Sequence, residues 1–404
     1  MAGTSPRDRV AEPRRADGSR RGDVVRSPLT GGRETIESIV VAFTLALLFR
    51  AFEAEAFVIP TGSMAPTLMG RHKDLACSSC GAVFQVGASQ EWDELAGRVR
   101  PDRIVPAARC FNCGTDIPLA IRPGQPDPRY PSFNGDRILV DKFAYDFAEP
   151  RRWDVVVFKY PEEAKTNYIK RLIGLPGETV SIAGGDIWTS RDGGAAEIAR
   201  KPPDTMRAML QCVHDSRHVS ADLQKAGWPL CWSDWSPRGQ GPTATWTSTD
   251  EGRSFSVSGG ATDAPATLRY RHFFPTADEW EGVRKGESLA GRARPTLIDD
   301  FQPYNAIGTR PHWVGDLALE MVCETTSGNG GRLAIDLVEG SAAHRCEIDL
   351  ATGDALLVLA GGQEGESAAR GRTPVRGKGS WKILFVNVDD EPVSYTHLTL
   401  PTKA

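Results

Sequence analysis

The stretch Phe57-Val-Ile-Pro-Thr-Gly-Ser-Met-Ala-Pro-Thr-Leu68 follows an apolar run directly and places one serine, Ser63, between a glycine and a methionine. Pro60 and Pro66 fix the backbone φ on both flanks, and Gly62 lets the chain bend. These features predict a stiff loop that holds the Ser63 hydroxyl in one place. The alternative interpretation is a plain turn, because clusters of proline, glycine and serine are typical of turns.

A serine hydroxyl is a poor nucleophile until a base removes its proton, and the seven histidines lie in no recognisable catalytic setting. Lys170 is a better candidate, in the stretch Asn167-Tyr-Ile-Lys-Arg-Leu-Ile-Gly-Leu-Pro-Gly-Glu178. Its neighbours are largely apolar, and a lysine shielded from water loses its proton more readily and then serves as a general base. The alternative interpretation is a solvated lysine on a strand face.

Three motifs follow one another along the chain: Pro60-Thr-Gly-Ser-Met-Ala-Pro-Thr67, Gly135-Asp-Arg-Ile-Leu-Val-Asp-Lys142 and Tyr168-Ile-Lys-Arg-Leu-Ile-Gly-Leu-Pro-Gly-Glu178. Together they resemble the motifs of type I signal peptidases, membrane serine proteases that use a serine and a lysine. The motifs cover less than half of the chain.

The resemblance implies a role for each matched residue. Ser63 would be the nucleophile and Lys170 the general base. The Ser63 backbone N–H and the Thr61 hydroxyl would form the oxyanion hole, and Met64 would line the substrate side. Catalysis would need no cofactor. The expected partners are the signal peptides of preproteins, the membrane and, in addition, the translocation channel.

The N-terminal part predicts a tail and an anchor. Residues 1–33 carry eight arginines without an apolar period, so we expect a disordered cytoplasmic tail. Residues 34–53 are predicted to be a transmembrane anchor, although their uninterrupted apolar centre, residues 39–49, is short of the about 20 residues that a span needs. The arginine bias would keep the N-terminus in the cytoplasm and place the catalytic part outside the plasma membrane. A cleaved signal sequence or a buried helix is the alternative.

Two Cys-x-x-Cys-Gly sequences lie between the serine motif and the strand motif, Cys77 with Cys80 and Cys110 with Cys113. Such pairs are typical of a zinc ribbon with four thiolate ligands. Residues 73–129 are therefore predicted to be an insertion that holds a structural Zn²⁺. Two disulfides are the alternative, because the inferred compartment is oxidising.

The remaining sequence predicts a mainly β protein. We expect a signal-peptidase-type β core over residues 54–72 and 130–190, and an inserted, jelly-roll-like β-sandwich over residues 191–392, where short strands alternate between polar and apolar residues. The sandwich is interpreted as a spacer, with a glycan- or peptide-binding face as the alternative.

The end of the chain departs from the family. Signal peptidases close with a Gly-Asp-Asn-Ser-type motif, which is not found here, and residues 393–404 are predicted to be a non-native tail outside the sandwich and the core. We therefore expect a truncated chain of uncertain activity.

The composition argues against one class of function. A formal net charge of −4 gives no indication of nucleic-acid binding. Two alternatives to a signal peptidase remain: a membrane-anchored binding protein with a vestigial serine–lysine pair, and a soluble self-cleaving repressor-type protease. The apolar run before Ser63 argues against the second.

Overall fold

The computed structural model describes residues 28–398 except 53, 94–95, 238–243, 259–264, 306–310, 327–329, 341, 359–367 and 390. The chain divides into two compact units. Unit 1 comprises residues 1–55 and 141–143, and unit 2 comprises residues 56–140 and 144–404. The predicted tail over residues 1–33 lies largely outside the described residues.

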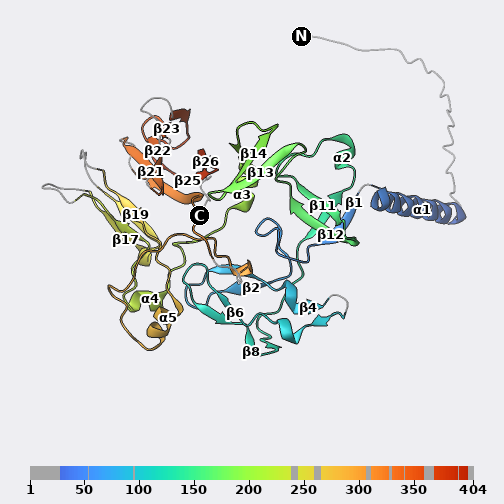
Figure 1. The fold of residues 1–404 in the computed structure, drawn as a ribbon, viewed down its shortest axis with the longest axis horizontal. Helices are drawn as coiled ribbons and strands as arrows, with labels where there is room; N and C mark the ends of the chain where they lie inside the picture. The colour runs from blue at the N-terminus through green and yellow to red at the C-terminus, as the bar shows by residue number, and fades with distance from the viewer. Residues whose placement is uncertain are drawn as a thin grey trace, which may run out of the picture. The chain divides into compact units, whose positions relative to one another are not determined.

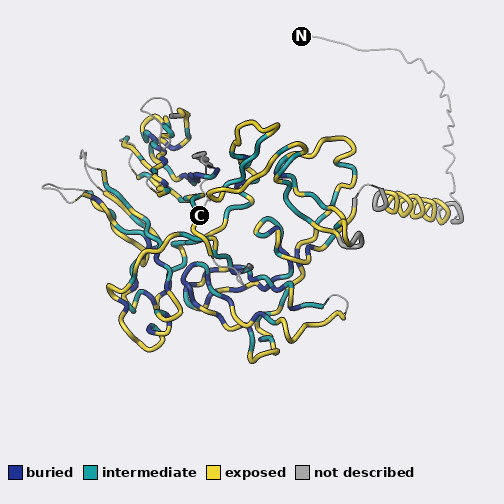
Figure 2. Tube along the Cα trace, in the orientation of Figure 1, coloured by how far each residue is buried: buried dark blue, intermediate teal, exposed yellow. Residues whose placement is uncertain are grey.

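Unit 1 contains helix α1 (Pro28–Phe52). Residues 32–48 of this helix are exposed (Figure 2), and Arg33 forms an ion pair with Glu37 at 2.7 Å. No helix in the described part of the chain is long and apolar enough to cross a membrane. The predicted transmembrane anchor over residues 34–53 is therefore not supported. The physical reason is the short apolar run over residues 39–49, which polar residues flank.

The segments predicted to form the catalytic β core contribute to several small sheets. β1 pairs with β10 and β11 with β12, while β14 pairs with both β13 and β15. Figure 1 shows β13 beside β14 and β11 beside β12. The elements of this core are β1 (Ala54–Val58), β10 (Arg137–Asp141), α2 (Ala144–Phe147), β11 (Val155–Tyr160), β12 (Glu163–Arg171), β13 (Glu178–Ala183), β14 (Asp186–Arg191) and β15 (Glu197–Ile198).

The cysteine-bearing insertion consists of short hairpins. β2 pairs with β3, β4 with β5, β6 with β7, and β8 with β9. Its elements are β2 (His72–Ala76), β3 (Val83–Gly87), η1 (Ser89–Glu91), β4 (Trp92–Asp93), β5 (Arg98–Val99), η2 (Pro101–Arg103), β6 (Ala107–Arg109), β7 (Asp116–Pro118), β8 (Ala120–Arg122) and β9 (Gln125–Pro126).

The region predicted to be one sandwich, residues 191–392, consists of two different parts. Its first part mixes helices with short hairpins: α3 (Pro203–Met209), α4 (Ala221–Lys225), β16 (Trp232–Asp234), β17 (Trp246–Thr249), η3 (Asp250–Gly252), β18 (Ser254–Val257), β19 (Leu268–Tyr270), α5 (Ala277–Arg284) and η4 (Pro303–Asn305). Buried residues of this part, among them Trp228 and Trp280, belong to the same hydrophobic cluster as the four cysteines. Periodicity along the sequence does not reveal that shared core.

The second part is a sandwich of two antiparallel sheets. One sheet has the order β20-β25-β26 and the other the order β21-β22-β23-β24. Ile335 and Ile348 from one sheet and Ile383 and Phe385 from the other belong to one buried cluster. The strands are β20 (Leu317–Thr325), β21 (Arg332–Glu339), β22 (Ala342–Asp349), β23 (Asp354–Val358), β24 (Ala368–Arg372), β25 (Gly379–Val388) and β26 (Glu391–Leu398).

The C-terminal segment differs from its prediction. Residues 393–398 were expected to lie outside the sandwich, but they form part of β26, which pairs with β25 from Glu391 to Leu398. The backbone of the exposed edge of β25 accepts this strand whatever its side-chain pattern, because strand pairing uses main-chain hydrogen bonds.

Candidate active site

The serine loop, defined here as residues 59–70, is a tight turn with Ser63 exposed on it. The Ala65 backbone N–H donates to the Gly62 carbonyl at 3.0 Å, and the Leu68 N–H donates to the Met64 carbonyl at 2.9 Å. Met64 itself is buried, with 7% of its surface exposed. The loop therefore points its hydroxyl outward while its methionine packs inward.

The strand motif holds both ends of the serine loop. The Ile59 N–H donates to the Asp136 carbonyl at 2.9 Å, and the Asp136 N–H donates to the Met69 carbonyl at 2.9 Å. The Asp136 carboxylate also accepts the Met69 N–H at 2.7 Å. A side chain at Gly135 would place its Cβ 2.0 Å from the Ile59 carbonyl oxygen, so only glycine allows this approach.

Thr61, the predicted second oxyanion donor, is exposed next to this packing. Behind it lies Gly70, where a Cβ would come within 2.2 Å of the Thr61 carbonyl carbon. The backbone at Gly70 therefore supports the backbone at Thr61 directly, and any larger residue at this position would displace the loop.

Lys170 reaches the serine from strand β12. It pairs with Val156 of β11, and its Nζ lies 3.0 Å from the Ser63 Oγ. The same amine donates to the Ile169 carbonyl at 2.8 Å and lies 5.4 Å from the centroid of the Tyr168 ring. The fold thus brings together the predicted nucleophile and the predicted base within hydrogen-bond distance.

The next residue on β12, Arg171, holds the far side of the serine loop. Its guanidinium donates to the Thr67 Oγ1 at 3.2 Å and to the Trp153 carbonyl at 3.0 Å. Burial lowers the pKa of Arg171, although an arginine keeps its charge near neutral pH. The Thr67 hydroxyl in turn donates to the Ala208 carbonyl at 2.9 Å. Two consecutive residues of one strand therefore contact two points of the loop.

Trp153 supports this arrangement in a strained backbone conformation. Its φ is 75°, which is unusual for a residue other than glycine. The residue is 5% exposed, and its indole Nε1–H donates to the Arg200 carbonyl at 2.8 Å. Its backbone N–H donates to the Leu172 carbonyl at 2.7 Å. These contacts hold Trp153 in place, and its carbonyl is thereby fixed opposite Arg171.

Glu178 at the end of the lysine motif closes the turn after β12. Its carboxylate accepts the Leu175 N–H at 2.9 Å and two hydrogen bonds from Arg152 at 2.7 and 2.8 Å. Arg191 donates to the same carboxylate at 3.1 Å. The Leu175 N–H and these arginines hold the pKa of Glu178 below its ordinary value. The turn that follows the lysine strand is therefore fixed by an ionised carboxylate.

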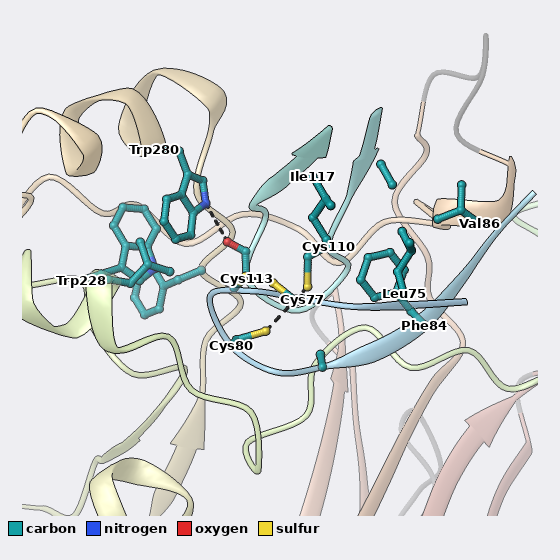
Figure 3. Packing of buried hydrophobic residues seen from close by; sticks show 14 of the residues in the cluster. Leu75, Cys77, Cys80, Phe84, Val86, Cys110, Cys113, Ile117, Trp228 and Trp280 are labelled. Atoms are coloured by element: carbon teal, nitrogen blue, oxygen red, sulfur yellow. Dashed lines mark hydrogen bonds between the residues drawn. The ribbon is translucent and has the colours of Figure 1, made fainter. Parts of the chain in front are cut away.

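The predicted cysteine ligands meet in one buried cluster, which Figure 3 shows. The four Sγ atoms of Cys77, Cys80, Cys110 and Cys113 lie within 4.8 Å of one another, and no residue of the cluster is more than 8% exposed. The Sγ of Cys77 lies 3.5 Å from that of Cys113, and the Sγ of Cys80 lies 3.7 Å from that of Cys110. These separations are too long for disulfides, whose bond length is about 2.0 Å.

The donor set fits a zinc ion. Four thiolates at about 2.3 Å from a tetrahedral centre lie about 3.8 Å apart, close to the two separations above. A bound dication would stabilise all four cysteines as thiolates. The cluster is therefore compatible with a structural metal.

Both cysteine pairs have the same local geometry. The Gly81 N–H donates to the Cys77 carbonyl at 2.8 Å, and the Gly114 N–H donates to the Cys110 carbonyl at 3.0 Å. Both glycines have a positive φ, 77° and 69°. The repeated turn explains the glycine after each pair.

The later part of the chain packs against the cluster. The Trp280 Nε1–H donates to the Cys113 carbonyl at 2.8 Å (Figure 3), and the Asn112 amide donates to the His218 carbonyl at 2.7 Å. Helix α5, which carries Trp280, begins with a capping box between Thr276 and Glu279. The cysteine cluster therefore joins the insertion to residues about a hundred or more positions downstream.

These observations define first a class of protein: a serine and a lysine in contact on a β scaffold are suited to nucleophilic hydrolysis. Residues 121–221 match the family model described as signal peptidase, peptidase S26, a family of peptidases. The matched range contains Lys170. No solved structure matches the chain.

Curated relatives point to the particular family. A signal peptidase I of Leptolyngbya laminosa is 40% identical over 94 residues, which are 22% of this chain and 46% of the relative. One from Pseudomonas aeruginosa is 50% identical over 58 residues, 11% of this chain and 20% of the relative. A probable signal peptidase I-1 of Synechocystis sp. is 25% identical over 186 residues, 44% of this chain and 62% of the relative. The chain thus spans less than two thirds of each of these relatives, and the matches confirm the predicted resemblance to type I signal peptidases.

Sequence reasoning missed the residues that position the pair. Gly135 and Asp136 lie in the strand motif and Arg171 in the lysine motif, but no local feature of these motifs indicates their roles. Thr67 carried no signal beyond its place at the end of the serine motif. Their roles depend on contacts between segments about 70 to 100 positions apart, which no local pattern reports.

Proposed function

We propose that this chain is an endopeptidase of the signal peptidase I type, which removes N-terminal signal peptides from translocated preproteins. Ser63 is the nucleophile and Lys170 the general base. The observation that supports this proposal is the distance of 3.0 Å between the Lys170 Nζ and the Ser63 Oγ. The similarity to signal peptidases supplies the substrate class.

The reaction follows from that geometry. With its amine neutral, Lys170 accepts the hydroxyl proton of Ser63 while the Oγ attacks the carbonyl carbon of the scissile bond. The ammonium then gives this proton to the leaving amine, the C–N bond breaks, and an ester to Ser63 remains. A water molecule that loses its proton to Lys170 hydrolyses the ester, which releases the signal peptide and restores the hydroxyl.

Thr61 and the Ser63 backbone N–H are proposed to stabilise the oxyanion that forms on the carbonyl oxygen. Removing one oxyanion donor lowers turnover by about 10²–10³. A Thr61→Ala variant should show a loss of this size, whereas Thr61→Ser, which keeps the hydroxyl, should retain most of the activity.

The experiment is cleavage of a synthetic preprotein by the purified full chain in detergent. We expect Ser63→Ala and Lys170→Ala to be inactive, and Lys170→Arg to be equally inactive because a guanidinium keeps its proton near neutral pH. Lys159→Arg, at an exposed position on the neighbouring strand β11, is the matched control and should leave the rate unchanged. Cleavage by Ser63→Ala or by Lys170→Arg at the wild-type rate would refute the proposal.

The proposed location is the outer side of the plasma membrane, with the N-terminus in the cytoplasm. The support is the arginine bias of residues 1–33 and the similarity to signal peptidases. Protease added to intact spheroplasts should digest the region after Phe57, and full protection of that region would contradict this location.

A further inference from the structure

A cavity of about 310 Å³ lies in the helix-and-hairpin part of the chain, away from the serine–lysine pair. Its aromatic walls come from Trp232 on β16, Trp246 on β17 and Phe255 on β18. Its volume reaches the lower end of the range of about 300–1,000 Å³ for small-ligand pockets. Aromatic faces of this kind pack against flat, weakly polar surfaces of a ligand.

Three residues that line this cavity carry buried polar atoms without a hydrogen-bond partner. They are the Ser233 Oγ, the Trp246 Nε1 and the Arg271 Nε. Among the residues that the structure describes, only seven such side-chain atoms occur, so this cavity accounts for three of them. Buried polar groups in folded proteins are almost always paired, so each of these three atoms can take a partner, either water or a ligand.

The charges at the cavity are balanced. Asp234 lines it with a carboxylate that accepts the Ser236 hydroxyl at 2.6 Å and the Trp246 backbone N–H at 3.0 Å. The Arg271 guanidinium lies over the rings of Trp235 and Phe273, 5.2 Å from each centroid. The Asp234 carboxylate and the Arg271 guanidinium both already have partners, so neither charge by itself selects an ion as the ligand.

The chemistry of a ligand follows from these groups. The indole N–H of Trp246 and the Nε–H of Arg271 are donors that require acceptors. The Ser233 hydroxyl can donate and accept a hydrogen bond, and the carboxylate of Asp234 only accepts. An apolar ligand would leave the two donors unpaired, and an anion would meet the Asp234 carboxylate. A compact ring with hydroxyls at its rim both donates and accepts, and its C–H face packs on an indole.

We propose that this cavity binds a neutral saccharide unit, held between the rings of Trp232, Trp246 and Phe255 by hydrogen bonds to Ser233, Trp246 and Arg271. The site is independent of the proposed peptidase activity, because none of its residues belongs to the serine loop or to β12. It gives the inserted region a binding role beside that of a spacer. An extended peptide of several residues requires more room than this partly open cavity of about 310 Å³ offers.

The test is saturation-transfer NMR on the purified full chain with glucose, galactose, mannose and N-acetylglucosamine, each supplied up to tens of millimolar. A ligand of this size with few contacts should bind with a dissociation constant on the order of millimolar. Tri-alanine serves as the peptide probe and acetate as the anionic probe. Saturation transfer to at least one sugar, and to neither other probe, supports the proposal.

Two variants of the cavity and one control variant localise the binding. Trp246→Phe keeps an aromatic side chain but removes the N–H donor, so the affinity for the bound sugar should fall about tenfold. Trp313→Phe, at an exposed tryptophan that does not line the cavity, is the matched control and should bind like the wild type. If Trp246→Phe lowers the melting temperature, Ser233→Ala provides a smaller change at the same cavity. This variant is also expected to weaken binding.

Ser63→Ala, which removes the proposed nucleophile, should bind the sugar with unchanged affinity, so that a failure of the peptidase proposal and a failure of this one are distinguishable. Absence of binding to every sugar would overturn the inference. Binding that Trp246→Phe and Ser233→Ala leave unchanged, or binding of the peptide in place of the sugars, would overturn it as well.

Discussion

The guanidinium of Arg171 donates a hydrogen bond to the Thr67 Oγ1 at 3.2 Å, while the preceding residue of the same strand, Lys170, contacts Ser63. Because the two contacts come from consecutive residues of β12, the strand fixes the serine loop at two points. The distance between base and nucleophile therefore depends on a threonine that takes no part in the reaction itself.

Thr67 is the first residue to test. Thr67→Val keeps the shape but removes the hydroxyl, which leaves a half-buried arginine donor unpaired at a cost of about 1–3 kcal/mol. A displacement of the loop by about 1 Å would lower turnover by about 10²-fold. Thr67→Ser, which restores the hydroxyl, should recover most of the rate. Equal rates for both variants would show that the contact does not position Ser63.

Asp136 should matter for both stability and rate. Asp136→Ala leaves the Met69 N–H without its carboxylate partner, so we expect a loss of about 1–3 kcal/mol in the free energy of unfolding together with lower turnover. Asp136→Asn retains an oxygen that accepts the same N–H and should behave like the wild type. Denaturant unfolding and preprotein cleavage measure the two effects, and an unchanged Asp136→Ala variant would contradict the role of this clamp.

The hydrogen bonds of Glu178 predict that the stability of the folded protein depends on pH. Its pKa is lower in the folded chain than in the unfolded one, so its contribution is fully present above the unfolded pKa of about 4.3 and is lost as the pH falls through the folded value. Glu178→Gln should lower the melting temperature at pH 7 but not at the acidic end of a titration. Glu197→Gln, at an exposed position on β15, is the control and should follow the wild type throughout. A Glu178→Gln deficit that stays constant with pH would refute the ionic explanation.

The cysteine cluster predicts one zinc ion per chain, the stoichiometry of a site with four thiolate ligands. A thiol reagent should release about one equivalent of metal from the full chain, and Co²⁺ substitution should give sulfur-to-metal charge-transfer bands. Cys110→Ser should weaken metal binding, whereas Cys212→Ser, at an exposed cysteine outside the cluster, should not. Two disulfides and no metal in the purified chain would exclude this site.

Part of the fold could be predicted because a few consecutive residues determine it. The strands β20, β21 and β22 coincide with stretches in which exposed and buried residues alternate, a pattern that a two-sided sheet imposes on each strand separately. The two Cys-x-x-Cys-Gly turns are equally local, because each glycine adopts the positive φ that its own turn requires.

Other features of the fold could not be predicted from the sequence, for physical reasons. The sandwich was predicted to begin near residue 191, although Trp228 and Trp280 instead belong to the core around Cys77 and Cys113. Hydrophobic residues in short, irregular elements carry no period that assigns them to one core or another. The pairing of β26 with β25 was missed because main-chain hydrogen bonds leave no trace in the side-chain pattern.

The sequence alone determined which groups are available for chemistry: Ser63 in a loop stiffened by prolines, Lys170 among apolar neighbours and four cysteines in two identical turns. Each of these signals resides in a few consecutive residues. Only the tertiary structure decided that the Lys170 Nζ lies 3.0 Å from the Ser63 Oγ and that Asp136 and Arg171 hold the serine loop against the lysine strand. Those distances join segments that are remote along the chain, and packing of the whole unit, not the local pattern, fixes them.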